Sequence, residues 1–305
     1  MERVFFCLPL NVGSTRQDGL MVYNQAMHED RNVLAEWRES APYWEKHAAT
    51  VRQMFAPISA ALIRIAHIKT GQRVLDVAGG TGEPSFEIAG IVAPQGRVVC
   101  TDAVAEMVAA AERLAHQRAI DHIEFKRCAA DSLPFDDGAF DTVVSRLGAM
   151  FFEDTLSALG ELLRVVRPGG SIALAVWSKP AANPFYYIVT DVMAAYVASP
   201  PEDPDAPGAF RFAERGKLAG LLARAGAVRV QEQVVDFHIE AALTPAEFWK
   251  LRSELSDSLR AKVARLTPAE LTQVVEQVAE RLEPFRDAER LRLPAQIIIT
   301  SGNKP

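Results

Sequence analysis

The stretch Val74-Leu75-Asp76-Val77-Ala78-Gly79-Gly80-Thr81-Gly82 decides the fold class of this chain. An apolar run ends near an acidic residue, a glycine-rich turn follows, and Glu83-Pro84-Ser85 is a suitable helix start. This order indicates a strand, a tight turn and a helix. Because glycine has no Cβ atom, a nucleotide-like ligand can approach the backbone of such a turn closely.

A strand–helix alternation continues on from this turn. We predict five strands, at residues 73–77, 97–101, 123–128, 140–145 and 171–177. Helices are expected between them, at residues 83–92, 104–117 and 155–166, with Asp154 as the N-cap of the last. Short apolar strands that alternate with helices imply an α/β fold with a mostly parallel, Rossmann-like sheet and helices on both faces.

The segments outside this alternation give the expected domain organisation. We predict a flexible leader at 1–30, N-terminal helices over the ligand site at 31–70, and a ligand-binding core at 71–178. An insert or lid is expected at 179–212, with a proline-rich acidic loop at 200–208. Residues 213–305 complete the core, and a helical insertion is expected at about 244–290, because Thr244-Pro245 and Thr267-Pro268 are both typical helix starts.

Bulk composition restricts the class of protein. The chain has 305 residues, 49% apolar content and a net charge of −6, which is typical of a soluble globular enzyme and argues against a nucleic-acid partner. Its three cysteines show no metal-ligand spacing, so no metal is predicted. The sequence contains no run of about twenty apolar residues, the length that a helix needs to span a bilayer. We expect a cytoplasmic protein with a small-molecule substrate, and we keep a homodimer as a candidate assembly.

Two acidic residues follow later strands of the predicted sheet. Asp102 ends the second strand about twenty residues after Gly82, where a carboxylate can accept hydrogen bonds from both hydroxyls of a ribose. The alternative for Asp102 is an N-cap of the next helix, and the two roles are compatible. Asp131 lies beyond the third strand and could accept from an adenine amino group, with Ser132 beside it; the alternative there is turn chemistry alone.

These motifs together resemble those of the class I S-adenosylmethionine-dependent methyltransferases. The resemblance rests on Asp76 to Gly82, then Asp102, then Asp131-Ser132-Leu133-Pro134-Phe135, then Leu163-Arg164-Val165-Val166-Arg167-Pro168-Gly169-Gly170. Within that class the chain is similar to the small-molecule branch that includes the ubiquinone/menaquinone-type C-methyltransferases. The stretch Ser145-Arg146-Leu147-Gly148-Ala149-Met150-Phe151-Phe152 and the Trp37…Ala41…Trp44 pattern match a bacterial subgroup of this branch. The resemblance covers roughly residues 35–240.

The resemblance implies a seven-stranded sheet whose last strand, expected at residues 295–300, is antiparallel. It also implies S-adenosyl-L-methionine as the cofactor. Asp76 and the glycines would hold its methionine end, Asp102 its ribose, and the segments after the second and third strands its adenine. The complete set of cofactor-binding candidates is Trp44, Asp76, Ala78, Gly79, Gly80, Thr81, Gly82, Asp102, Ala103, Met107, Ala130, Asp131, Ser132, Ser145 and Arg146.

No acid–base pair stands out in the sequence. The resemblance implies that Ser145 and Arg146 face the reactive methyl group. The catalytic candidates are His47, Arg146 and His238, of which the two histidines could act as a general base. Trp44 and Tyr43 could hold a sulfonium by cation–π attraction, and their alternative is core packing. Phe151, Phe152, Phe185, Tyr186 and other aromatic residues make the expected substrate side apolar, which suits a hydrophobic or aromatic small molecule.

Other function classes remain open at this point. An NAD-type oxidoreductase would need a Gly-x-Gly-x-x-Gly spacing, which Gly80-Thr81-Gly82-Glu83-Pro84-Ser85 breaks at its last position. A methyltransferase-like protein could use the cofactor structurally for another reaction, such as a cyclisation, and a non-enzymatic binding module is a further alternative. Asn183-Pro184-Phe185-Tyr186 resembles a motif of DNA and protein amino-methyltransferases, but it follows the fifth strand and not the fourth.

Overall fold

The computed structural model describes residues 33–198, 203–288 and 290–305. Residues 34–305 belong to one structural unit, and the elements described below lie in it apart from Val33 at the start of the first helix. The leader expected at residues 1–30 is outside the described residues. The same holds for residues 199–202, at the start of the proline-rich loop.

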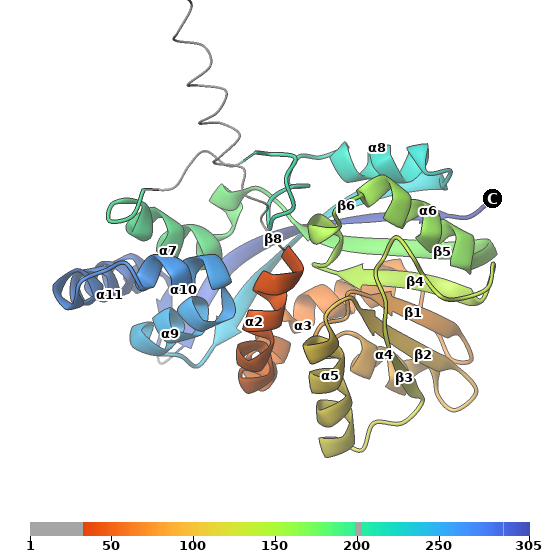
Figure 1. The fold of residues 1–305 in the computed structure, drawn as a ribbon, viewed down its shortest axis with the longest axis horizontal. Helices are drawn as coiled ribbons and strands as arrows, with labels where there is room; N and C mark the ends of the chain where they lie inside the picture. Colours follow the sequence, from red (N-terminus) through yellow and green to blue (C-terminus); the bar gives the residue numbers. More distant parts are fainter. Residues whose placement is uncertain (1–32, 199–202, 289) are drawn as a thin grey trace, which may run out of the picture. The chain divides into compact units, whose positions relative to one another are not determined.

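The fold is built on a mixed sheet (Figure 1). Its strands are β1 (Arg73–Val77), β2 (Arg97–Asp102), β3 (Ile123–Arg127), β4 (Phe140–Arg146), β5 (Val166–Trp177), β6 (Val228–Ala241), β7 (Arg286–Asp287) and β8 (Arg290–Asn303). The strand order is β3-β2-β1-β4-β5-β8-β6, and the short β7 pairs with β8. The first five strands are parallel, whereas β8 is antiparallel to β5 and β6. The predicted mostly parallel sheet with an antiparallel last strand is confirmed.

The strand order reverses between β1 and β4. From β1 the chain proceeds to β2 and β3 on one side, and β4 and β5 follow on the other. In sheets of this kind, ligands bind beyond the carboxyl ends of the strands at such a reversal point. The glycine-rich turn after β1 and the Ser145-Arg146 pair at the end of β4 therefore border the expected site.

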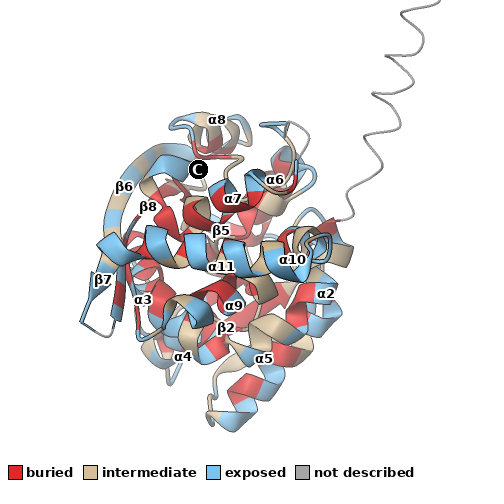
Figure 2. Ribbon diagram, turned by 90° about the vertical axis from the view of Figure 1, so that its left-hand side faces the viewer, coloured by how far each residue is buried: buried red, intermediate tan, exposed pale blue. Residues whose placement is uncertain are grey.

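Helices cover both faces of the sheet (Figures 1 and 2). Helix α3 (Ala48–Ile65) contacts β4, β5, β6 and β8, and α4 (Ser85–Val92) contacts β1, β2 and β3. On the opposite face, α6 (Thr155–Val165) contacts β5 and α8 (Lys217–Arg224). Helix α5 (Ala105–Gln117) contacts β2 and β3. Figure 2 shows the buried residues gathered in the sheet and on the helix sides that face it. Leu75, Val143 and Leu174 have no exposed surface.

Further helices gather at the carboxyl edge of the sheet. Helix α2 (Val33–Lys46) precedes α3. We use the name helical cap for α7 (Pro184–Ala194), α9 (Pro245–Leu255), α10 (Asp257–Val263) and α11 (Pro268–Leu282), which contact one another as α11 with α7 and α9, and α10 with α9. Thr244 and Thr267 each form a capping box, so both predicted helix starts are confirmed.

Some predicted boundaries differ from the observed ones. Helix α4 begins at Ser85 and not at residue 83, and β5 begins at Val166 and not at residue 171. Strand β8 extends from Arg290 to Asn303 and not only over residues 295–300. Its first part alternates buried and exposed residues, since β6 and β8 continue as a two-stranded ribbon past the end of β5.

Candidate functional site

The glycine-rich turn after β1 has an unusual backbone. Ala78 has φ of 56° and Gly82 has φ of 103°, both in a region that residues with side chains rarely adopt. A Cβ atom on Gly82 would lie 2.1 Å from Cζ of Phe86. The Gly79 amide donates to the Thr101 carbonyl at 2.9 Å, which fastens the turn to β2. The turn therefore keeps its shape only with these small residues.

Asp102 connects β2 to the turn. Its Oδ2 accepts a hydrogen bond from the Gly80 amide at 3.0 Å, and its Oδ1 accepts from the Val104 amide at 2.9 Å. The second bond forms a local turn before α5, whose N-cap residue is Val104 and has no side-chain cap, so the alternative of Asp102 as the N-cap is wrong. Burial raises the pKa of Asp102 to about 6, although hydrogen bonds from the Val104, Gly80 and Ala103 amides act against this shift.

Asp76 lies beneath the same turn and has no exposed surface. Its Oδ2 accepts from the Ser85 hydroxyl at 2.7 Å, whereas its Oδ1 has no hydrogen-bond partner. Burial raises the pKa of Asp76 to about 7, and the Ser85 hydrogen bond and the Arg146 charge oppose this effect. Because an unpaired buried carboxylate oxygen is costly, this atom is suited to a cationic or hydrogen-bonding ligand group.

Arg146 and Ser145 lie at the end of β4, next to this carboxylate. Arg146 Nη1 donates to Ser59 Oγ at 2.9 Å, and burial lowers the pKa of its guanidinium against the opposing charges of Glu83, Asp76 and Glu87. The buried Ser145 hydroxyl has no partner. A Cβ atom on Gly148 would lie 2.8 Å from this hydroxyl and 2.5 Å from Cβ of Ala78. Since the segment after β4 passes this close to the turn after β1, both strands contribute to one site.

The segment after β3 is held in place by Arg164 of α6. Arg164 donates to the carbonyls of Leu133 and Phe135 at 2.8 and 2.7 Å, and Glu161 accepts from the Leu133 amide at 2.9 Å. Asp131 and Ser132 are exposed at its beginning, and Ala130 is partly buried. The Cys128 amide donates to the Asp102 carbonyl at 3.0 Å, which brings this segment beside β2.

Helix α2 lies against the start of α5. Ala41 packs with the buried Met107 and Val104, and Trp44 packs against them. The Trp44 indole nitrogen donates to the Leu255 carbonyl at 3.1 Å, and the Trp37 ring contacts the Phe151 ring at 5.0 Å. The N-terminal helix therefore connects α5, the segment after β4 and the helical cap. The Tyr43 ring is already covered by the Arg260 guanidinium at 4.8 Å.

The structure brings neither histidine candidate to the end of β4. His47 Nε2 is paired with Glu254 Oε2 at 2.5 Å, and twelve residues separate it from Ser59, about 18 Å along the α3 axis. His238 lies on β6, three strand positions from β4, or about 14 Å across the sheet.

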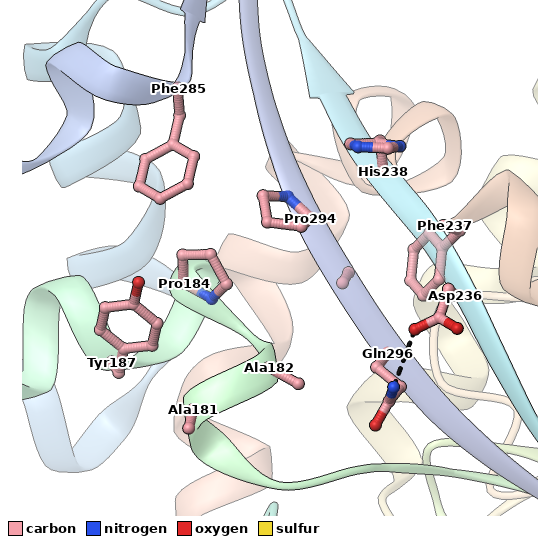
Figure 3. Close-up of a pocket in the computed structure, with 11 residues that line it drawn as sticks. Ala181, Ala182, Pro184, Tyr187, Asp236, Phe237, His238, Phe285, Pro294 and Gln296 are labelled. Atoms are coloured by element: carbon pink, nitrogen blue, oxygen red, sulfur yellow. Dashed lines mark hydrogen bonds between the residues drawn. The ribbon is translucent and has the colours of Figure 1, made fainter.

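His238 instead borders a separate pocket of about 350 Å³ (Figure 3). The pocket lies between the start of α7 and the β6–β8 ribbon, and its lining is Ala181, Ala182, Pro184, Tyr187, Asp236, Phe237, His238, Phe285, Pro294, Ala295 and Gln296. Gln296 Nε2 donates to Asp236 Oδ1 at 2.8 Å across its floor. Phe237 stacks on Trp177 with ring centres 6.4 Å apart, so this pocket adjoins the end of β5.

The described residues contain neither a cluster of metal ligands nor a helix that could span a membrane. In this part of the chain, His, Cys, Asp and Glu residues form no group that could hold a metal ion. Across the same residues, no helix has the length and apolar character to cross a bilayer.

The comparison with protein families decides what kind of core this is. Residues 58–197 match the ubiE/COQ5 methyltransferase family. This stretch is similar to the methyltransferases of that family, and we call it the ubiE/COQ5-type core. It contains β1 to β5 and therefore every strand end that borders the glycine-rich turn, and it confirms the resemblance stated from the sequence motifs.

Individual relatives agree with this ubiE/COQ5-type core. An uncharacterized protein of Mycobacterium tuberculosis H37Rv is 34% identical over 158 residues, which are 52% of this chain and 56% of that protein. The ubiquinone/menaquinone biosynthesis C-methyltransferase UbiE of Cellvibrio japonicus is 36% identical over 119 residues, which are 39% of this chain and 48% of that protein. The chain thus spans about half the length of the curated relatives it matches.

A solved structure supports the fold of the ubiE/COQ5-type core. Phosphoethanolamine N-methyltransferase 2 of Haemonchus contortus, in complex with S-adenosyl-L-methionine, superposes with a TM-score of 0.52 at 16% identity. The match covers 86% of this chain and 57% of that protein. At this identity the likeness concerns the fold alone.

Sequence reasoning missed two buried polar groups, one within the ubiE/COQ5-type core and one outside it. Arg252 of α9 is buried, and Trp177 at the end of β5 carries an indole nitrogen without a partner. Arg252 lies among buried apolar residues of its helix, such as Phe248 and Leu255. A charged residue at an apolar position of a helix was the available signal.

Proposed function

We propose that this protein is an S-adenosylmethionine-dependent methyltransferase that acts on a small hydrophobic or aromatic molecule. The observation that carries the proposal is the pair of carboxylates on the glycine-rich turn. Asp76 offers a buried oxygen without a partner, and Asp102 lies one strand away with its Oδ2 on the Gly80 amide. The family match of residues 58–197 supports methyl transfer rather than hydride transfer.

The residues on this edge of the sheet fit the cofactor chemically. The ammonium group of the methionine moiety would be a partner for Asp76. The Arg146 guanidinium carries the charge that complements the carboxylate of the methionine moiety. Asp102 would accept from the ribose hydroxyls, while Ala103 and Met107, with Ala130 to Ser132, would border the adenine. The glycine-rich turn would provide room for close approach of the cofactor to the backbone.

The protein itself needs to do little chemistry in such a reaction. The bound cofactor would supply a methyl group already activated on a sulfonium, ready for in-line displacement. The residues around the strand ends would align the acceptor and exclude water. Trp37, Trp44 and Phe151 form an aromatic wall from α2 to the segment after β4, which is consistent with an apolar acceptor.

The direct test is methyl transfer in a panel of small acceptors. Purified protein is incubated with S-adenosylmethionine and with quinols, phenols and aromatic acids, and S-adenosylhomocysteine and methylated products are measured by mass spectrometry. We expect acceptor-dependent formation of both products in equal amounts, and loss of both in the Asp76→Asn variant. A folded protein that binds the cofactor but converts an acceptor without forming S-adenosylhomocysteine would support the cyclase-type alternative and contradict methyl transfer.

A further inference from the structure

Arg252 is an unusual residue of the helical cap. It lies on α9 with 5% of its surface exposed, and its Nε has no hydrogen-bond partner. Among the described residues, the one titratable group whose charge acts on the pKa of Arg252 is the Tyr186 phenol; burial lowers that pKa. The guanidinium therefore has no carboxylate partner in this part of the chain.

Aromatic rings compensate this charge only in part. The guanidinium carbon of Arg252 lies 4.5 Å from the centre of the Phe185 ring and 4.6 Å from the centre of the Tyr186 ring. Cation–π contacts stabilise a buried guanidinium, but they do not replace the hydrogen bonds that it loses with its hydration shell. The guanidinium therefore still lacks an anionic or strongly accepting partner.

A second donor without a partner lies beside the same tyrosine. The Trp177 ring packs against the Tyr186 ring with centres 5.2 Å apart, and the buried Trp177 Nε1 interacts with the Tyr186 phenol but has no acceptor in good hydrogen-bonding geometry. Buried N–H groups are almost always paired in folded proteins. Two buried N–H groups therefore flank one ring: among the described residues, the Arg252 Nε has no partner, and the Trp177 Nε1 has only the Tyr186 phenol nearby, outside good hydrogen-bonding geometry, so one further acceptor would satisfy both.

These donors lie near the end of β4, where the methyl group is expected. The Phe55 ring of α3 contacts the rings of Trp177 and Phe185, with centres 5.6 and 5.8 Å apart. Four residues further along α3, Ser59 accepts the hydrogen bond from Arg146. Four residues correspond to about 6 Å along a helix axis. The separation between Arg146 and these donors is therefore of the size of a molecule of one or two rings.

We propose that the methyl acceptor carries an anionic oxygen, as a carboxylate or a phenolate, which Arg252 and Trp177 bind among the rings of Phe185 and Tyr186. This inference rests on the proposed function and narrows its substrate class from apolar aromatic molecules to aromatic anions. The ring contacts hold the apolar body of the substrate, and the guanidinium selects for charge. Arg252 is thus a specificity-determining residue contributed by the helical cap and not by the ubiE/COQ5-type core.

The test compares charged probes with neutral probes of the same shape. Calorimetric titrations use 2-naphthoate against 2-naphthamide, and 4-nitrophenol against 4-nitroanisole, each with and without S-adenosylhomocysteine. We expect the charged member of at least one pair to bind about tenfold or more tightly, as for charge-assisted hydrogen bonds. For a carboxylate site, the preference for the charged probe should not depend on pH. For a phenolate site, it should grow as the phenol ionises.

Variants assign the preference to these residues. Arg252→Met should abolish it and leave the affinity for S-adenosylhomocysteine unchanged, and Trp177→Phe, which keeps the ring, should weaken it. The matched control is Arg292→Met, since Arg292 is half exposed and paired with Glu240 on the β6–β8 ribbon. This control should keep the full preference. If Arg252→Met does not fold, Trp177→Phe carries the test.

The outcomes distinguish a failure of the anion site from a failure of the proposed function. Equal binding of charged and neutral probes to a wild-type protein that binds S-adenosylhomocysteine would overturn the anion site and leave the proposed function standing. So would a preference that survives in both Arg252→Met and Trp177→Phe. Absence of S-adenosylhomocysteine binding would overturn the proposed function itself, whatever the probes show.

Discussion

Asp102 and Gly80 join the second strand to the turn that follows the first, because Asp102 Oδ2 accepts a hydrogen bond from the Gly80 amide at 3.0 Å. The same carboxylate accepts from the Val104 amide through its other oxygen. One side chain therefore fixes the turn, shapes the entry to α5 and remains available to a ligand at the carboxyl edge of the sheet.

Asp102→Ala should lower the free energy of cofactor binding more than it lowers the free energy of unfolding. Loss of charge-assisted hydrogen bonds to the ribose and of the bond to Gly80 is expected to cost about 1–3 kcal/mol of binding free energy, measured by calorimetry. Asp154→Ala is the control, because Asp154 caps α6 by accepting from the Ser157 amide at 3.0 Å. It should lower stability by about 1 kcal/mol and leave cofactor affinity unchanged. Unchanged affinity in Asp102→Ala would mean that Asp102 only shapes the backbone.

Asp76 should make stability depend on pH. Burial raises its pKa to about 7 in the folded protein, above the value of about 4 in an unfolded chain. The folded state therefore binds the proton more tightly, and the stabilising contribution is fully present below about pH 4 and lost as the pH rises through about 7. Asp76→Asn mimics the protonated group, so its melting temperature relative to wild type should increase over this range. A difference that stays constant with pH would contradict the burial of an unpaired carboxylate.

The same carboxylate should couple cofactor binding to proton release. A cationic ligand group favours the ionised form of Asp76 and lowers its pKa. Affinity for S-adenosylmethionine should rise by up to about tenfold per pH unit below pH 7 and level off above it. Titrations in buffers of different ionisation enthalpy should show up to one proton released near pH 6. Binding without proton release would place the ligand cation away from Asp76.

Gly82→Ala should disrupt the turn, whereas Gly90→Ala should not. A Cβ atom on Gly82 would meet the Phe86 ring at 2.1 Å, at a φ of 103°. We expect a loss of about 2–4 kcal/mol in unfolding free energy, together with weaker cofactor binding. Gly90 lies inside α4, where a Cβ atom would meet no other atom within 4 Å. Alanine at this position should therefore raise the unfolding free energy by about 0.5–1 kcal/mol. Equal effects of both substitutions in urea unfolding would contradict the described geometry.

Arg164→Met should loosen the segment after β3. Arg164 binds the carbonyls of Leu133 and Phe135 as well as Glu161 and Asp137. Their loss should cost about 1–3 kcal/mol of stability and speed amide hydrogen exchange at residues 131–135. If this segment borders the adenine, affinity for S-adenosylmethionine should fall while affinity for methionine stays the same. Unchanged exchange in the segment would show that other contacts hold it.

The core of the fold was predictable because its signals are local. An apolar strand followed by glycines predicts the turn after β1, and Asp154, Thr244 and Thr267 predict helix starts through side-chain caps that the structure contains. The full extent of β8 was missed, since its first half is a ribbon with one exposed face and shows only a short alternation of Leu291, Arg292 and Leu293.

The contacts between the helical cap and the end of β5 could not be predicted in the same way. Arg252 meets Phe185, Tyr186 and, through them, Trp177 only after the chain has folded, and sixty-six residues separate Arg252 from Tyr186. Such contacts depend on how α9 packs on α7 and leave no motif in the sequence. His238 shows the converse, because a residue chosen for its chemistry proved to line a different pocket.

The most direct test of the central claim is a calorimetric titration of the purified protein with S-adenosylmethionine, S-adenosylhomocysteine and NAD. The arrangement of Asp76, Gly80 and Asp102 predicts saturable binding of both sulfur ligands at one site per chain, and no binding of NAD. Protein that is folded by circular dichroism but takes up neither sulfur ligand, or that binds NAD in their place, would contradict a methyltransferase site on this turn.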